Sequence, residues 1–379
     1  MLRKTILGLL TAALLSACVL PQTALAAPDN RAGACVLVCA DTGETLYSKN
    51  PDAHMLIAST TKIMTALVVI NHCDPDTSVT IRPEWTGVEG SSMYLKAGES
   101  YTIRELLYGL LLVSGNDAAT ALACVCGGSI EGFAKMMNDE AAALGLQNSH
   151  FQNPHGLDAE GHYSTAADLA VITCAAMKKP LFAEIVGTST ATVRDQTLVN
   201  HNKLLRTYPG ALGVKTGYTM AAGRILVSCA ERAGLRLVCV TISDPDDWTD
   251  HAALLDWGFA NFEYKSVLPL DAVCELPVIG GSKQSVALRA GSDTRVLLKK
   301  GAALTMTVEA PPFVYAGFRQ DECAGRVFVK ADGQDLAEYP LVYSESVDVD
   351  PVRQKDAWQR FRRAWFMVNK YGYVFTYGD

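Results

Sequence analysis

Ser59 and Lys62 stand three positions apart and could together carry out nucleophilic chemistry. A serine hydroxyl is a weak nucleophile at neutral pH and needs a base within hydrogen-bonding distance. The apolar residues between 63 and 70 recur at helical spacing, which predicts a buried helix that begins near Ser59. Positions i and i+3 share one helix face, so the Lys62 amine would lie beside the Ser59 hydroxyl. Burial would lower the pKa of the lysine and allow it to act as the base.

Two further motifs follow along the chain. Ser114-Gly115-Asn116 stands between an apolar run and an alanine-rich stretch, which predicts a loop between two helices. Lys215-Thr216-Gly217 is typical of a strand edge, where a glycine leaves room for the backbone of a ligand. A cation beside a hydroxyl is suited to binding a carboxylate. Taken singly, the three motifs could be a capped helix, an N-cap and a strand end with a surface lysine, but their combination in this order indicates one site.

The chain resembles the low-molecular-weight penicillin-binding proteins over nearly its whole length. Within the penicilloyl serine transferase superfamily, it is most similar to the D-alanyl-D-alanine carboxypeptidases. Beyond the three motifs, the stretches that carry this resemblance are 90–95, 104–119, 153–158, 161–166 and 213–219. The resemblance implies an α/β fold in which an antiparallel sheet is flanked by helices, as in serine β-lactamases and transpeptidases. A small all-β domain would follow.

The resemblance also implies a reaction. Ser59 would attack the carbonyl of the penultimate D-alanine in a peptidoglycan stem peptide, release the terminal D-alanine, and form an acyl-enzyme that water hydrolyses. Lys62 would take the Ser59 proton. Ser114, held by Asn116, would pass a proton to the departing amine. β-Lactams are expected to act as covalent inhibitors.

Substrate binding is assigned by the same resemblance. Lys215 and Thr216 would bind the terminal carboxylate of the substrate, and Gly217 would leave room for its backbone. The backbone N–H groups of Ser59 and Tyr218 would stabilise the negative charge of the tetrahedral intermediate, which needs preorganised donors.

No metal and no cofactor are expected for this route. The seven histidines form no His-Glu-x-x-His pattern, and the cysteines form no Cys-x-x-Cys pair. His155 and His162 flank turn residues and are interpreted as shaping a loop.

Two alternative functions compete with this interpretation. Class A β-lactamases share the first and third motifs but resolve the acyl-enzyme with a glutamate that primes a water. Their Glu-x-x-Leu-Asn context is absent between Asn116 and Lys215, and their middle motif is Ser-Asp-Asn rather than Ser-Gly-Asn. Both differences favour the carboxypeptidase. The other alternative is a non-catalytic wall-binding scaffold, which the presence of nucleophile, base and anion site together disfavours.

The elements that position these residues follow from hydrophobic periodicity. We expect a hairpin over 35–48, several helices over 103–144, a helix over 167–177, strands at 213–216, 224–229 and 235–242, and a closing helix over 248–262. Together they form a catalytic domain at 27–265. Short alternating runs separated by glycine-containing turns predict the small β-rich domain at 266–350.

The first 26 residues are typical of a secretory signal, because two basic residues precede an apolar stretch and then small residues. Ala24-Leu25-Ala26 predicts cleavage after Ala26. A lipobox-like sequence ending at Cys18 predicts lipidation there instead. The first is favoured, because the family usually carries its anchor at the other end. We therefore expect an exported protein at the extracytoplasmic face of the bacterial membrane or in the wall.

The net charge and the C-terminal segment indicate which partners the protein could bind. The chain of 379 residues is 49% hydrophobic and carries a formal net charge of −7, which argues against binding to nucleic acid. The segment 351–379 is basic and amphipathic at helical spacing, typical of a helix on an anionic membrane surface. A terminal helix packed on the β-rich domain is the alternative. The alternation of aromatic residues after 370 departs from the usual family anchor.

Eleven cysteines would suggest a disulfide framework in an exported protein. Most of them lie in apolar runs, where a free thiol behaves as a small hydrophobic side chain. We therefore predict buried, unpaired thiols and a host whose exterior is not strongly oxidising. The cysteines on which this prediction rests are Cys35, Cys39, Cys124, Cys126, Cys174, Cys229 and Cys239.

Overall fold

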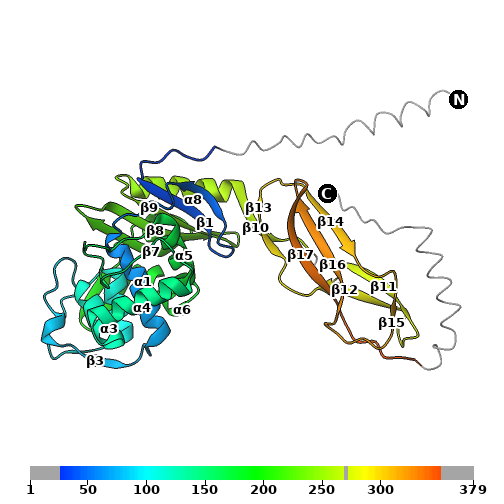
Figure 1. The fold of residues 1–379 in the computed structure, drawn as a ribbon, viewed down its shortest axis with the longest axis horizontal. Coiled ribbons are helices and arrows are strands. Elements are labelled where there is room, and N and C mark those ends of the chain that lie inside the picture. The colour runs from blue at the N-terminus through cyan, green and yellow to red at the C-terminus, as the bar shows by residue number, and fades with distance from the viewer. Residues whose placement is uncertain (1–25, 269–271, 351–379) are drawn as a thin grey trace. The chain divides into compact units, whose positions relative to one another are not determined.

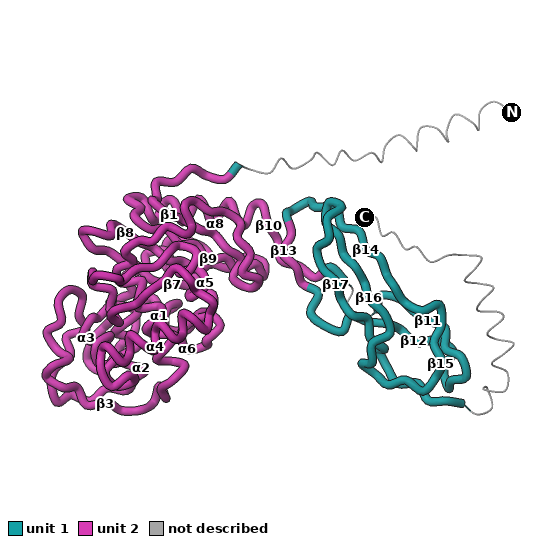
Figure 2. The backbone as a smooth tube through the Cα atoms, viewed as in Figure 1, with its two compact units in different colours: residues 1–26, 267–294, 299–379 teal, residues 27–266, 295–298 magenta. Residues whose placement is uncertain are grey.

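The computed structural model describes residues 26–268 and 272–350 (Figure 1). They form two compact units, one of residues 27–266 with 295–298, and one of 267–294 with the described residues from 299 onward (Figure 2). The predicted signal, apart from Ala26, and the segment 351–379 lie outside the described residues. Among the residues that are described, no helix has both the length and the apolar character to cross a membrane.

The larger unit is built on a five-stranded antiparallel sheet in the order β2-β1-β9-β8-β7. The predicted hairpin and the three predicted strands are all present, with β7 and β8 longer than expected. Strand β7, which carries Lys215, Thr216 and Gly217, lies at one edge of the sheet. The bounds are β1 Ala34–Cys39, β2 Thr45–Lys49, β7 Ala211–Thr219, β8 Gly223–Arg232 and β9 Leu235–Ile242.

Helices cover both faces of this sheet (Figure 1). Side chains alternate across a strand, so Val36 and Val38 of β1 join the core shared with α1 to α6, whereas Leu37 joins the core under α8. Because both faces are buried, every residue of β1 is buried. The helices are α1 Thr61–His72, α2 Ile103–Leu112, α3 Asn116–Gly127, α4 Ile130–Ala143, α5 Ala166–Met177, α6 Pro180–Gly187, α7 Leu204–Thr207 and α8 Asp247–Asn261.

Several helices begin at a capping side chain that fixes where the preceding loop ends. The Thr102 hydroxyl accepts a hydrogen bond from the backbone of Glu105 and completes a capping box at the start of α2. Ser129 and Thr165 cap α4 and α5 in the same way. Two short hairpins complete the unit, β3 Ser78–Thr80 with β4 Ser100–Thr102, and β5 Thr190–Val193 with β6 Gln196–Val199.

The smaller unit contains a six-stranded sheet in the order β14-β16-β17-β12-β11-β15 and no helix among its described residues. Its strands are β11 Cys274–Ile279, β12 Ser285–Ala290, β14 Leu304–Glu309, β15 Val314–Tyr315, β16 Cys323–Ala331 and β17 Gln334–Tyr343. A separate pair joins β10 Phe262–Ser266 to β13 Arg295–Lys299, and all of it except Lys299 belongs to the larger unit. The predicted fold class, a helix-flanked antiparallel sheet followed by a small all-β part, is confirmed.

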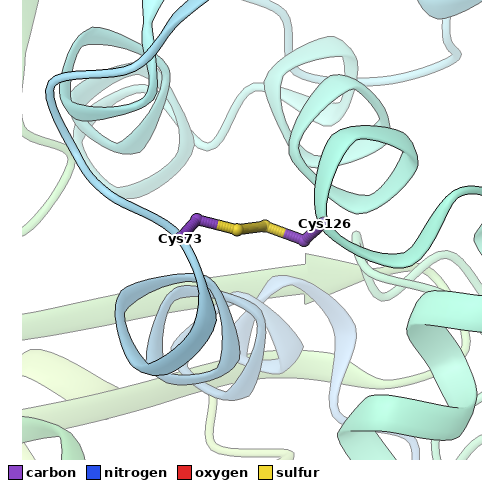
Figure 3. Close-up of a disulfide and its surroundings, with 2 residues drawn as sticks. All are labelled: Cys73 and Cys126. Carbon is purple, nitrogen blue, oxygen red and sulfur yellow. A yellow bond between two sulfur atoms is a disulfide. The ribbon is translucent and has the colours of Figure 1, made fainter.

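The prediction of unpaired thiols was wrong at Cys126, which forms a disulfide with Cys73 (Figure 3). Cys73 directly follows α1, and Cys126 lies in the last turn of α3. Helical periodicity places a cysteine on a helix but does not show which other helix end approaches it, so the sequence did not reveal this pair. The free cysteines of the described residues are Cys35, Cys39, Cys124, Cys174, Cys229, Cys239, Cys274 and Cys323.

A buried histidine predicts how stability depends on pH. His251 of α8 is fully buried between Ser228 and Thr241, and burial lowers its pKa to about 3. An unfolded histidine takes up its proton near pH 6.5. The stability contributed by neutral His251 is therefore complete above pH 6.5 and is lost as the pH falls, by about 2 kcal/mol at pH 5.

Urea denaturation at pH 7.5 and pH 5 measures this loss. We expect His251→Gln to lower stability at pH 7.5 but to lose about 2 kcal/mol less than the wild type between the two pH values. Equal losses in the two proteins would contradict the assignment.

Candidate active site

Ser59 lies in a turn of 3₁₀ helix, Ala58–Thr60, that runs directly into α1. Lys62, in the first turn of α1, is fully buried. Its Nζ donates a hydrogen bond to Ser59 Oγ at 2.9 Å, the contact that the spacing of the two residues predicts. The site therefore contains a half-buried hydroxyl in direct contact with a buried amine.

The Lys62 amine has two other acceptors, Asn116 Oδ1 and the backbone carbonyl of His155, each at 2.7 Å. Burial lowers the pKa of Lys62 well below its usual 10.5, the charge of Lys215 lowers it further, and Asp117 acts in the opposite direction. A neutral amine keeps two N–H donors and gains one lone pair. With its donors directed at Asn116 and His155, that lone pair can accept the proton of Ser59.

Asn116 is held in the orientation that this contact requires. Its Nδ2 donates to the carbonyl of Glu89 at 2.5 Å, so Oδ1 is the atom that faces Lys62. Its backbone N–H donates to the carbonyl of Ser91 at 2.7 Å. Ser114 lies two residues earlier, buried between α2 and α3 with φ of 62°. The predicted loop between two helices is confirmed, with Asn116 as the first residue of α3.

Sequence reasoning gave no role to Asp117, yet it anchors the loop 90–95 to α3. Its buried carboxylate accepts hydrogen bonds from the backbones of Met93 and Leu95, both at 3.0 Å, and from Ser92 Oγ at 2.6 Å. Its place in the first turn of α3 also suits a negative charge. The sequence signals were an acidic residue at a predicted helix start and its place within the resembling stretch 104–119, and neither of them indicated this contact.

Strand β7 passes beside the turn that carries Ser59. A Cβ added to Gly217 would lie 3.3 Å from the backbone nitrogen of Ser59 and from the carbonyl oxygen of Ile57, a tight contact that shows how closely β7 approaches this turn. Lys215 is buried, and burial lowers its pKa to about 7. Its Nζ donates to the carbonyl of Thr216 at 3.0 Å.

The structure thus places Ser59, Lys62, Asn116, Lys215 and Gly217 around one point. Ser114 lies on the loop that leads to Asn116, and Thr216 and Tyr218 alternate with the glycine on β7. The Tyr218 side chain is 65% exposed.

A loop over residues 153–157 contacts the first turns of α1 through its backbone carbonyl groups. Besides the His155 carbonyl that accepts from Lys62, the carbonyl of Pro154 accepts from Thr65 Oγ1 at 2.6 Å. The sequence drew attention to this stretch but not to its carbonyl groups, which carry no residue-specific signal.

His162 fixes the beginning of α1 through its ring. Its Nδ1 accepts from the backbone of Gln152 at 3.1 Å, so Nε2 carries the proton and donates to Thr61 Oγ1 at 2.9 Å. Burial lowers the pKa of His162 to about 4, which keeps this arrangement neutral at physiological pH. His155 contributes through both its backbone and its ring, because its carbonyl accepts from Lys62 and its Nδ1 accepts from the backbone of Leu157 at 3.2 Å.

The family is shown by comparison with known proteins. A family model described as D-alanyl-D-alanine carboxypeptidase matches residues 21–246, which is more than half of the chain. The chain belongs to the D-alanyl-D-alanine carboxypeptidase family. A second model, described as penicillin-binding protein 5, C-terminal domain, matches residues 262–349.

Individual relatives cover most of the chain. The D-alanyl-D-alanine carboxypeptidase DacF of Bacillus subtilis is 33% identical over 335 residues, which is 84% of this chain and 86% of the relative. DacB2 of Mycobacterium tuberculosis is 41% identical over 254 residues, 64% of this chain and 87% of the relative. The structure of penicillin-binding protein 5 from Haemophilus influenzae superimposes with a TM-score of 0.71 at 31% identity and covers 86% of this chain and 99% of its own.

Gly156 offers a test of how tightly the 153–157 loop meets the catalytic turn. Its φ is +83°, and an added Cβ would lie 1.8 Å from the carbonyl oxygen of Ala58. Gly161 has a similar φ of +77°, but its nearest neighbour would be the flexible Gln152 side chain at 3.2 Å. Gly161→Ala should therefore cost about 1 kcal/mol through backbone strain alone. Gly156→Ala should cost about 3 kcal/mol or more, because backbone must move.

Chemical denaturation of the two variants measures the difference. Equal destabilisation would show that the loop does not press on the Ala58–Thr60 turn.

Proposed function

We propose that this protein is a serine-type D-alanyl-D-alanine carboxypeptidase that removes the terminal D-alanine from peptidoglycan stem peptides through an acyl-enzyme on Ser59. Family membership supports the activity. The observation that carries the serine mechanism is the 2.9 Å contact between Ser59 Oγ and the buried amine of Lys62. β-Lactams would acylate the same hydroxyl, because they present a reactive carbonyl to it.

The first step is proton transfer from Ser59 Oγ to the neutral Lys62 Nζ as the oxygen attacks the substrate carbonyl. The resulting oxyanion needs donors that are already in place. The backbone N–H groups of Ser59 and Tyr218 have this role in the proposal. The closeness of Gly217 to the Ser59 backbone supports it, because it brings the two chain segments together.

In the second step the C–N bond breaks and the leaving amine of D-alanine takes a proton. Ser114, on the loop that Asn116 fixes beside Lys62, is the proposed carrier of the proton that Lys62 took from Ser59, so Lys62 is neutral again after this step. Water then hydrolyses the ester between Ser59 and the shortened peptide. No group outside the protein is required for these proton transfers.

Lys215 and Thr216 are proposed to bind the terminal carboxylate of the substrate. A buried ammonium beside a hydroxyl makes strong charge-assisted hydrogen bonds with a carboxylate. Since burial already lowers the pKa of Lys215 to about 7 in the free protein, binding of the anion would favour its charged form.

Three further predictions are part of this proposal. Residues 1–26 direct export and are cleaved after Ala26, so that the enzyme acts on the wall outside the membrane. The segment 351–379 contacts anionic lipid. The functional domains are 27–265 and 266–350.

Release of D-alanine from diacetyl-L-lysyl-D-alanyl-D-alanine tests the proposed function. We expect Ser59→Ala to lower this rate at least about 1000-fold and to abolish the covalent adduct with penicillin, because the nucleophile is gone. Ser100→Ala, at an exposed serine of β4, is the matched control and should keep the wild-type rate. Full turnover by Ser59→Ala would refute the mechanism, and rapid hydrolysis of penicillin by the wild type would indicate a lactamase.

The pH dependence of kcat/KM reports the ionisations of the free enzyme. Lys62 must be neutral to accept a proton, so the rate should fall on the acidic side. Lys215 must be charged to bind a carboxylate, so the rate should also fall above about pH 7. In Lys215→Arg the guanidinium stays charged, and we expect a lower rate that no longer declines between pH 7 and pH 9. An unchanged alkaline decline in this variant would exclude Lys215 as its cause.

A further inference from the structure

The disulfide joins the far ends of the two helices that carry the contacts of the catalytic amine. Lys62 lies in the first turn of α1, and Asn116 opens α3. Cys73 directly follows α1 and Cys126 lies in the last turn of α3, so the sulfur atoms bridge the opposite ends of the same two helices (Figure 3). At a rise of 1.5 Å per residue, the disulfide is about 16 Å from the site along α1.

The helix pair is therefore fixed at both ends. At one end Lys62 Nζ donates to Asn116 Oδ1 at 2.7 Å, and at the other end stands the covalent bond. Between them, four of the eight buried residues of α3 are alanines. The buried alanines of α3 are Ala118, Ala119, Ala121 and Ala123.

The disulfide also closes the chain segment that carries Ser114 and Asn116. Residues 73 and 126 are 53 positions apart, and the loop between them includes the 90–95 loop, α2 and the Ser114 loop. Cutting the bond would release this whole segment from its covalent closure at the end of α1.

We propose that the Cys73–Cys126 disulfide is a positioning bond and a reducible modification site that keeps Lys62 aligned with Asn116 and Ser59. This inference rests on the proposed function, since its effect is on acylation of Ser59. Both cysteines are half-buried, so a small dithiol can reach the bond. Two electrons and two protons from the dithiol convert the S–S bond into two thiols, and the dithiol becomes a cyclic disulfide.

Separating α1 from α3 would change the pH dependence of acylation, an effect that a loss of stability alone does not produce. Burial is the main cause that lowers the pKa of Lys62. If α3 moves away from α1, water reaches the amine and its pKa rises toward 10.5. At a given pH more of the lysine is then protonated, so the acidic limb of the acylation profile moves to higher pH.

The experiment compares the full-length wild type, purified without reductant, with the same protein after treatment with dithiothreitol and with Cys73→Ser/Cys126→Ser. Second-order acylation by a fluorescent penicillin is followed from pH 5 to pH 9, well below the melting temperature of each form. We expect both opened forms to acylate about 5- to 30-fold more slowly at pH 7, with the acidic limb displaced upward by half a pH unit or more. Melting should also fall, by about 10 °C.

Cys124→Ser is the matched control, because Cys124 is also half-buried and lies on the same helix but is free. It should acylate like the wild type and respond to dithiothreitol like the wild type. Mass mapping of the untreated protein should find Cys73 and Cys126 linked. Free thiols at both positions, or opened forms with the wild-type rate and pH profile, would overturn the inference. If the untreated wild type is acylated at Ser59 but the opened forms behave like it, the inference fails while the proposed function stands.

Discussion

The site depends on removing one lysine amine from water. Lys62 would be an ammonium ion in solvent and could not accept a proton from Ser59. The fold buries it completely, places a second cation nearby at Lys215, and gives it acceptors that a neutral amine can satisfy with two donors. Burial of an uncompensated ammonium is costly, so it favours the neutral form of Lys62, which the proposed proton transfer from Ser59 requires. In that proposal, the amine accepts the serine proton through its contact with Ser59 Oγ.

The surrounding fold excludes water from that amine and fixes its orientation. Three chain segments converge on α1. The 153–157 loop supplies a carbonyl from one side, the start of α3 supplies the Asn116 amide from another, and β7 brings Gly217 against the Ser59 backbone. The position of β7 at the sheet edge leaves it free of a second neighbouring strand among the described residues. Buried polar contacts add to the apolar packing at two places. His162 bonds to Thr61 at the beginning of α1, and Asp117 bonds the 90–95 loop to the start of α3.

Much of this arrangement could be predicted from the sequence, because the signals for it are local. The i, i+3 spacing of Ser59 and Lys62 and the helical period after them predicted that the two side chains are neighbours on a buried helix. The helix-flanked sheet was predicted from hydrophobic periodicity along the chain and from the family resemblance. The features that could not be predicted depend on backbone atoms or on contacts between segments that are far apart in the sequence. The His155 carbonyl is invisible to residue type, Asp117 looks like any acidic residue at a helix start, and the partner of Cys126 is set by how α1 and α3 pack. These are tertiary facts, and only the fold supplies them.

The central claim is that Lys62 is neutral at the pH at which the protein works. NMR of the protein labelled with ¹³C and ¹⁵N lysine, with the Lys62 signal assigned by its absence in Lys62→Arg, follows the ionisation of that amine directly. We predict a midpoint well below 10.5, because burial and the charge of Lys215 both lower the pKa of this amine. A Lys62 signal that titrates near 10.5, as an exposed lysine does, would contradict the claim that burial makes this amine the base.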